Sequence, residues 1–489
     1  MSNERIVLLV FSSVGGTLAG FSIGEGFGLI MPFALALLWG SISIPSLGFF
    51  WGLLAVLVSH RWLLDLHPLE WMGVPSALSF PITLFIWMLC GVVGGMLIGG
   101  WTFLAHKIRP IKNASFKNKI FNALILASLW GLAENLLAEW PLFWVGIGTS
   151  VLPGDRWLAG LARLIGSGGL ACVQLLIGWW IWQLVITYRR KIVWKRLFCW
   201  GISLLLIAHI IGWNLLSKDM NSESISVAMW QTNIPIREKF SNKQIDRLPQ
   251  SVQRALSQAN ELGASFLLAP EGTLTKDQEL IAPAPISFLT GGFRWVKNQQ
   301  RSSLLIFNKG KKKYEEAIDK YRLVPLGEWV PDFHGFSWRG LSAVGGLHSG
   351  DPSRKLIWNG PSVAAAICYE ISDGRAVSKA VNAGSEWILA LANLDPYPKL
   401  LQRQFLALSQ LRSIENSRDL ITVANTGPTS LINSSGKIQV LFPSYQEKIG
   451  LVELHLRQGK TGYMILGQFP LLVFLLIGFV GQYFPIDRK

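Results

Sequence analysis

The hydrophobic positions divide the chain into three parts. Seven long apolar runs fill residues 1–216, an eighth lies near the C-terminal end, and none of similar length occurs between residues 217 and 462. A helix needs about 20 apolar residues to cross a bilayer. We therefore expect a transmembrane helical bundle over residues 1–216, and a last transmembrane helix with a short tail over residues 463–489. The runs occupy residues 5–24, 27–45, 46–60, 81–105, 119–138, 163–188, 197–216 and 463–484, and the third is the shortest.

The middle part, residues 217–462, has a different pattern. Short β-rich segments alternate there with two segments, Asp246–Leu262 and Leu400–Ser417, whose apolar residues recur at helical spacing. Strands that alternate with helices predict a layered α/β domain. The predicted strands are Ile225–Trp230, Ser265–Ala269, Ser303–Phe307, Ser362–Ile367, Trp387–Ala392, Leu420–Ala424, Ser430–Ile432 and Ile438–Leu441.

Basic residues cluster in two loops between the apolar runs. One cluster follows the fourth run and the other follows the sixth. Cytoplasmic loops of membrane proteins are enriched in lysine and arginine, so we expect both loops and both termini, including the tail Asp487-Arg488-Lys489, to be cytoplasmic. Residues 217–462 would then lie on the outer face of the membrane. The clusters are Lys107, Arg109, Lys112, Lys117 and Lys119, and Arg189, Arg190, Lys191, Lys195 and Arg196.

The composition favours a membrane protein over a nucleic-acid-binding protein. Half of the residues are hydrophobic, 15% are charged, the mean hydropathy is +0.36, and 22 residues are tryptophan, which prefers membrane interfaces. The formal net charge is +15, but ten of the 45 Lys and Arg residues lie in the two loops and no nucleic-acid motif accompanies them. We therefore expect no nucleic-acid partner.

Only one of the four cysteines lies in the middle part of the chain. Cys90, Cys172 and Cys199 fall in or at the ends of apolar runs, where a small apolar thiol is common. Cys368 has no partner for a disulfide within its own domain. Its sequence position therefore leaves two readings, a buried structural thiol or a reactive one.

Three motifs add candidate chemistry to this cysteine. In the first motif, a predicted strand is followed by a carboxylate. In the second, a lysine precedes an apolar segment with a Gly-Glu turn. In the third, a predicted buried strand is followed by the cysteine and then, two positions on, by a glutamate. Taken alone, such an acid or such a lysine is usually a solvated surface residue, but strand ends in α/β folds are where sites are assembled. The motifs are Pro270-Glu271-Gly272, Lys320-Tyr321-Arg322-Leu323-Val324-Pro325-Leu326-Gly327-Glu328 and Ile367-Cys368-Tyr369-Glu370.

Together these motifs resemble the nitrilase superfamily, whose members share a Glu–Lys–Cys triad. Within it, the seven-plus-one apolar runs and the motif from Lys320 to Glu328 are similar to the apolipoprotein N-acyltransferases; the segment Trp230–Pro235 also matches that family. The resemblance implies an extracytoplasmic nitrilase-like αββα sandwich over residues 217–462. It also implies a location in the bacterial cytoplasmic (inner) membrane.

The resemblance further implies a reaction in two steps without a metal or an organic cofactor. A phospholipid, typically phosphatidylethanolamine, gives an acyl chain to Cys368 as a thioester, and the α-amine of the S-diacylglyceryl cysteine of a lipoprotein then accepts it. Glu271 is the expected general base and Lys320 the expected cation for the oxyanion. Glu328, Glu370 and Tyr369 are expected to support them, and Gln231, Asn393 and Tyr397 to bind substrate.

One loop departs from the family pattern. The family has Asn-Asp-Ala-Trp-Phe-Gly after the strand that follows the cysteine, whereas this chain has Asn393-Leu394-Asp395-Pro396-Tyr397-Pro398. Asn393 matches, and Tyr397 is a partial substitute for the missing Trp-Phe pair. Two alternatives to an N-acyltransferase stay open: a membrane-tethered amidase or nitrilase, which the same triad would serve, and a catalytically silent scaffold on the same fold, which the altered loop supports best.

Overall fold

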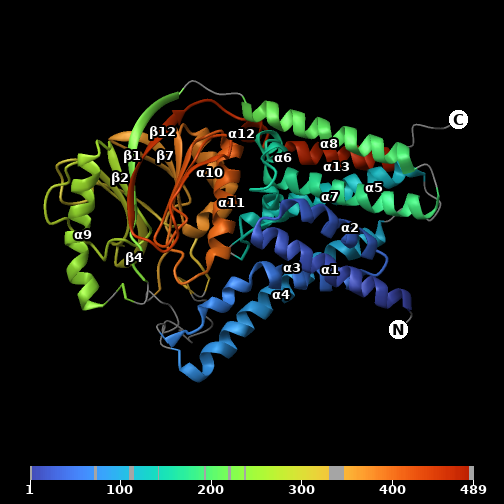
Figure 1. Ribbon diagram of the computed structural model, residues 1–489, viewed down its shortest axis with the longest axis horizontal. Helices are drawn as coiled ribbons and strands as arrows, with labels where there is room; N and C mark the ends of the chain where they lie inside the picture. Colours follow the sequence, from blue (N-terminus) through green and yellow to red (C-terminus); the bar gives the residue numbers. More distant parts are fainter. Residues whose placement is uncertain are drawn as a thin grey trace.

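The chain folds into a helical bundle and a two-sheet domain, and α11 (Lys399–Asn416) lies between them (Figure 1). The computed structural model describes residues 3–70, 74–108, 115–140, 142–191, 194–217, 222–235, 238–239, 241–325, 327–329 and 346–483. The basic residues Arg109 and Lys112 and the tail 487–489 lie outside these ranges.

Each of the eight predicted apolar runs contains a helix. Five helices of the described residues are long and apolar enough to cross a membrane, and three apolar helices are shorter, so the number of spans stays a prediction. The five long helices are α1 (Asn3–Glu25), α4 (Ser76–Lys107), α5 (Phe116–Ala138), α7 (Ala162–Arg189) and α8 (Trp194–Ser217). The shorter ones are α2 (Met31–Ser41), α3 (Pro45–Ser59) and α13 (Phe469–Tyr483).

Large apolar side chains cover the outside of the bundle. Only 6% of the residues in the apolar 18-residue stretch of α8 are buried, and Leu204, Ile210 and Trp213 of this helix are each more than half exposed. An apolar surface of this extent is suited to lipid rather than water. Helix α1 begins and α13 ends at the same end of the bundle, the end away from the sheets (Figure 1).

The second part is a sandwich of two six-stranded sheets. Their strand orders are β12-β1-β2-β3-β4-β5 and β11-β10-β9-β8-β7-β6, with parallel pairing at β1–β2–β3 and at β7–β8–β9. The first sheet contains β1 (Ser222–Gln231), β2 (Phe266–Ala269), β3 (Ser287–Val296), β4 (Gln299–Phe307), β5 (Glu316–Asp319) and β12 (Lys448–Arg457). The second contains β6 (Lys355–Trp358), β7 (Gly360–Ile367), β8 (Trp387–Ala392), β9 (Leu420–Ala424), β10 (Ser430–Ile432) and β11 (Ile438–Leu441).

Burial explains the layers. Inward-facing residues of both sheets, such as Val227, Leu268 and Leu389, form one core between them. Helix α9 (Asn242–Glu261) covers the outer face of the first sheet, and α10 (Gly374–Asn382) and α11 (Lys399–Asn416) cover that of the second. The predicted αββα sandwich is therefore confirmed. The eight predicted strands are present, whereas β3, β5, β6 and β12 were not predicted.

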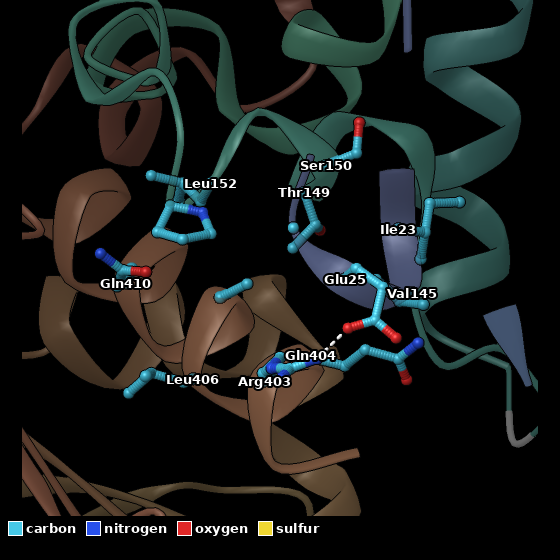
Figure 2. A pocket seen from close by; sticks show the side chains of 13 residues that line it. Ile23, Glu25, Val145, Thr149, Ser150, Leu152, Arg403, Gln404, Leu406 and Gln410 are labelled. Carbon is cyan, nitrogen blue, oxygen red and sulfur yellow. Dashed lines mark hydrogen bonds and ion pairs between the residues drawn. The ribbon is translucent and has the colours of Figure 1, made fainter. Parts of the chain in front are cut away.

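Helix α11 joins the two parts of the molecule because it is buried on both sides. Phe405 and Leu408 pack on the second sheet, and Leu411 and Ile414 pack on residues of the bundle. At this junction a small cavity of about 70 Å³ separates α11 from the end of α1, and Glu25 pairs with Arg403 at its wall (Figure 2). The other side chains labelled in Figure 2 are Ile23, Val145, Thr149, Ser150, Leu152, Gln404, Leu406 and Gln410.

Candidate active site

Three loops that follow strands bring the predicted triad residues together. Glu271 follows β2, Lys320 follows β5 and Cys368 follows β7. Lys320 Nζ donates hydrogen bonds to Glu271 Oε1 at 2.9 Å and to Glu328 Oε1 at 2.7 Å. The Cys368 thiol is close enough to the Glu271 carboxylate for the two groups to interact by charge and hydrogen bonding. A thiol, a carboxylate and an ammonium group therefore share one site.

The backbone at Cys368 is strained. Cys368 has φ of 53° and starts a 3₁₀ turn, Cys368–Ser372, directly after β7. A non-glycine residue in the left-handed region costs about 1–3 kcal/mol and persists only where its surroundings hold it. The carboxylate of Glu370 holds this turn, because Glu370 Oε2 accepts a hydrogen bond from the N–H of Ile367 at 2.8 Å. The tight turn presents the thiol at the end of the strand.

Glu370 also ties the cysteine turn to the segment that carries the lysine. Its Oε1 accepts a hydrogen bond from the N–H of Tyr321 at 2.7 Å, and its Oε2 pairs with Arg354 Nη1 at 2.8 Å. The side chains of Glu370 and Arg354 are each 1% exposed. Burial raises the pKa of Glu370, and the positive charge of Arg354 opposes that rise. One buried ion pair thus positions both Cys368 and Lys320.

Glu370→Gln is expected to lower both stability and activity. Breaking a buried ion pair leaves an uncompensated charge, here that of Arg354, and costs about 3 kcal/mol or more of unfolding free energy. Thermal unfolding in detergent, followed by circular dichroism, should show a clearly lower Tm. Glu315→Gln is the control, because Glu315 belongs to the exposed pair Lys311–Glu315. Equal Tm values for the two variants would contradict the assigned role of Glu370.

Glu271 is fixed through both of its carboxylate oxygens. Oε1 accepts from Lys320, and Oε2 accepts a hydrogen bond from the N–H of Asn393 at 3.0 Å. Gly291 of β3 lets the neighbouring strand approach this loop, since a Cβ at that position would lie 2.4 Å from Glu271 Cα. The Asn393 side chain is held in turn, because its Oδ1 accepts from Asn425 Nδ2 at 3.2 Å.

The ammonium of Lys320 is buried but well compensated. The Lys320 side chain is 1% exposed. Burial alone would lower its pKa, but the carboxylates of Glu271 and Glu328 outweigh burial and raise this pKa well above its ordinary value. Lys320 therefore stays charged over the physiological range. Burial and then the same two carboxylates raise the pKa of Cys368 well above the ordinary thiol value, and the charge of Lys320 opposes this rise. Cys368 is consequently a thiol in the resting site and needs a base to become a nucleophile.

A cavity of about 220 Å³ opens beside the thiol. Its walls are mostly apolar, and they come from the sheet domain and from loops of the helical bundle. A pocket with apolar walls and a few polar groups is typical of a ligand site. The lining residues are Trp62, Trp144, Lys239, Glu271, Gly272, Phe293, Ser302, Val324, Gly327, Glu328, Cys368, Tyr369, Asn393, Leu394, Asp395, Pro396, Tyr397 and Leu401.

Two aromatic contacts attach this cavity to the helical bundle. The ring of Tyr369 stacks on Trp144 at 5.6 Å, and its hydroxyl donates to the carbonyl of Phe143 at 2.7 Å. Tyr397 meets Trp62 edge to face at 5.1 Å. Trp62 lies in the 3₁₀ segment Arg61–Leu66 after α3, and Trp144 follows α5. The cavity therefore has a wall built by loops of the bundle.

The other predicted site residues differ in where they lie relative to the cavity. Glu328, Tyr369, Asn393 and Tyr397 line the cavity, and Glu370 supports it from behind. Gln231 is buried and lies outside the cavity lining, where its Nε2 donates to the carbonyls of Pro443 and Gln446, both at 2.8 Å. The substrate-binding role of Gln231 therefore stays a prediction, and its Oε1 has no hydrogen-bond partner among the described residues.

Sequence reasoning missed Arg354, Lys239 and Trp62, whereas Trp144 was among the loop aromatic residues expected to guard the lipid entrance. Arg354 lies in no motif, and its pairing with Glu370 is visible only in the folded chain. Trp62 lies far from the cysteine in the sequence. Among the residues that the structure describes, no group of three or more His, Cys, Asp or Glu side chains is placed to hold a metal ion.

The chain is similar to known proteins over nearly its whole length. An apolipoprotein N-acyltransferase of Prochlorococcus marinus (strain SARG) is 50% identical over 479 residues, which are 98% of this chain and 97% of that protein. The protein of the same name from strain MIT 9313 is 51% identical over 483 residues, with the same coverage. No family model matches the chain. Among solved structures, an amidase of the nitrilase superfamily from Nesterenkonia aligns with 51% of this chain and 96% of its own, at 14% identity and a TM-score of 0.37.

Proposed function

Because the chain belongs to the apolipoprotein N-acyltransferase family, we propose that it moves an acyl chain from a phospholipid, through a thioester on Cys368, to the α-amine of a diacylglyceryl apolipoprotein. The observation that carries this proposal is the contact of Lys320 with Glu271 and Glu328, beside the thiol and at the wall of an apolar cavity. Phosphatidylethanolamine is the donor that we expect.

The first half-reaction forms the thioester. Glu271 takes the proton of the Cys368 thiol while the sulfur attacks the ester carbonyl of the phospholipid. The carbonyl oxygen becomes negative, and Lys320 Nζ and the N–H of Tyr369 stabilise it, at about 3 kcal/mol for each well-placed donor. The ester C–O bond then breaks, and Glu271 returns its proton to the leaving oxygen. A lysophospholipid leaves, and the acyl chain remains on sulfur.

The second half-reaction forms an amide. The α-amine of the diacylglyceryl cysteine attacks the thioester carbonyl, and Glu271 takes a proton from the attacking nitrogen. The C–S bond breaks, and the thiolate regains a proton from Glu271. In this scheme Glu328 and Glu370 keep Lys320 and the cysteine turn in place. Asn393 fixes the base through its N–H, and Tyr397 and Tyr369 form the walls for lipid.

The proposed orientation follows from the helices and the charges. We assign residues 1–216 and 463–489 to the bacterial cytoplasmic membrane, with both termini in the cytoplasm, and residues 217–462 to its outer face. The assignment of the outer face rests on the basic loops. The wall that the bundle loops contribute to the cavity supports a site at the membrane surface, where lipid substrates would reach Cys368. Cysteine labelling of an added tail at residue 489 with an impermeant reagent tests the orientation, and labelling in intact cells would contradict it.

The activity is tested with purified protein in detergent. The protein is mixed with a phospholipid that carries a labelled acyl chain and with a synthetic S-diacylglyceryl cysteine peptide, and mass spectrometry follows the peptide. The expected product is a peptide that carries one more labelled acyl chain in amide linkage. Release of ammonia from small amides, without acylated peptide, would instead support an amidase. A folded protein without either activity would support a scaffold.

A further inference from the structure

Lys239 is a cation at the cavity that the proposed chemistry does not use. It lies after β1, in a segment without a recognised motif, and it lines the same cavity as Cys368. Within the described part of the chain, no hydrogen bond or ion pair engages its ammonium group. The other lysine of the site, Lys320, is held by two carboxylates. Lys239 is therefore the lysine that remains open to a ligand.

The ammonium of Lys239 is placed directly beside the catalytic loop. A Cβ at Gly272 would lie 2.7 Å from Lys239 Nζ, so the lysine packs on the backbone that follows Glu271. Gly272 has φ of 62°, a conformation that other residues rarely adopt. The glycine thus leaves room for the ammonium next to the proposed base.

The surroundings of Lys239 favour an added anion. Burial is the main cause that lowers the pKa of Lys239 to about 8, although the charges of Glu271 and Asp395 oppose it. Glu271 already accepts from Lys320 and from the N–H of Asn393. A partly buried ammonium without a direct partner gains from a bound anion, because charge-assisted hydrogen bonds are strong in such sites.

We propose that Lys239 binds the phosphodiester of the donor phospholipid and so positions its ester at Cys368. This inference rests on the proposed function. The phosphate of a glycerophospholipid is joined to the same glycerol as the ester, so an ester beside Cys368 brings the phosphate close to the loop at Gly272. Lysine binds phosphate as a compact point charge. The apolar walls of the cavity take the acyl chain, and Lys239 selects donors that carry a phosphate.

Two acyl donors, one with a phosphate and one without, distinguish phosphate binding by Lys239 from a general contribution of this lysine to the reaction. The first is dioleoyl-phosphatidylglycerol with labelled acyl chains, and the second is p-nitrophenyl octanoate, an ester without phosphate that releases nitrophenolate when it acylates Cys368. The measured quantity is the ratio of kcat/KM for the two donors. Lys239→Met is expected to lower this ratio roughly 10- to 100-fold, as for loss of one hydrogen bond to a charged group. Lys239→Arg should restore most of it, with the change mainly in KM.

The outcomes distinguish the inference from the proposed function. An unchanged ratio in Lys239→Met, or an equal loss with both donors, would overturn the phosphate role of Lys239. A wild-type protein that reacts with the nitrophenyl ester but with no phospholipid would overturn the proposed function instead. Lys311→Met is the matched control, because Lys311 is exposed and pairs with Glu315 away from the cavity; its ratio should equal that of the wild type. Dioleoyl-phosphatidylethanolamine in a third arm shows whether the phosphate suffices or the head group also matters.

The same ratio is expected to depend on pH. The pKa of Lys239 is lowered to about 8, so its ammonium is charged below that pH and is lost as the pH rises through it. Preference for the phospholipid should therefore fall between about pH 7 and about pH 9 in the wild type but not in Lys239→Arg, whose charge persists. A flat wild-type ratio would contradict the role. Among the described residues, Glu271 and Asp395 act on Lys239 by charge, Glu328 and Cys368 line the same cavity, and Lys320 pairs with Glu271; the charges of these groups affect the reactions of both donors.

Discussion

Cys368→Ala is expected to reduce acyl transfer to background, a loss of roughly a million-fold. Among the described residues that line the cavity, Cys368 carries the only thiol, and the strained turn with φ of 53° presents the sulfur to the cavity. Transfer of labelled acyl chain to the diacylglyceryl peptide is the measurement. The loss should occur without a large change in Tm, because the turn is held by Glu370 rather than by the thiol.

Cys199→Ala provides the matched control for this variant. Cys199 is an exposed cysteine on α8, in the bundle and outside the cavity. Its replacement should leave the rate of transfer unchanged. Substantial transfer by Cys368→Ala, with product of the correct mass, would mean that another group carries the acyl chain or that the transfer is direct.

Lys320→Met is expected to abolish transfer and to destabilise the domain. Loss of an oxyanion donor costs about 10²–10³-fold in rate. In addition, Glu271 and Glu328 lose the positive charge of Lys320 with which both of them pair. Removal of one partner from a buried ion pair lowers the free energy of unfolding by about 3–5 kcal/mol. Rate of transfer and Tm are measured together.

A double variant separates the catalytic part of this effect from the structural part. Lys320→Met combined with Glu328→Gln removes the ammonium together with one of the two carboxylates that it neutralised. We expect Tm to recover in part, while transfer stays at the level of the single variant. Return of transfer along with Tm would show that Lys320 acts only through stability.

The sequence was a good guide to the helices, since long apolar runs have few alternatives to helices in a membrane. It was a weaker guide to strands. Strand β3 contains Gly291 and Gly292, which predict against a strand, yet Gly291 is needed for the close approach to Glu271. Strand β12 carries charged residues on an edge of its sheet, and its pairing with β1 joins residues more than 200 positions apart. Such pairing depends on the fold and leaves little local pattern.

The candidate site was predictable where a residue follows a strand end. Glu271, Lys320 and Cys368 meet because the strands before them end at the same side of the sandwich. Arg354 and Lys239 were not predictable, because each is assigned a role through a contact that only the folded chain creates. Arg354 pairs with Glu370, and Lys239 lies beside Gly272. Partnerships of this kind are set by tertiary packing.

The structure shows how the Asn393–Pro398 loop contacts Glu271 although its sequence departs from the family pattern. Its contact with the proposed base is made by the N–H of Asn393, which is a backbone group that does not depend on the side chains that follow. Tyr397 packs on Trp62 and lines the cavity. The loop therefore keeps its contact with Glu271 while its side chains differ.

The thioester itself is the most direct test of the account. Purified wild-type protein is incubated with labelled phospholipid in the absence of an acceptor peptide, digested, and examined by mass spectrometry before and after treatment with neutral hydroxylamine. We expect the acyl mass on the peptide that contains Cys368, and we expect hydroxylamine to remove it. An acyl group that resists hydroxylamine, that lies on another residue, or that never forms while transfer to the acceptor proceeds would contradict the proposed mechanism.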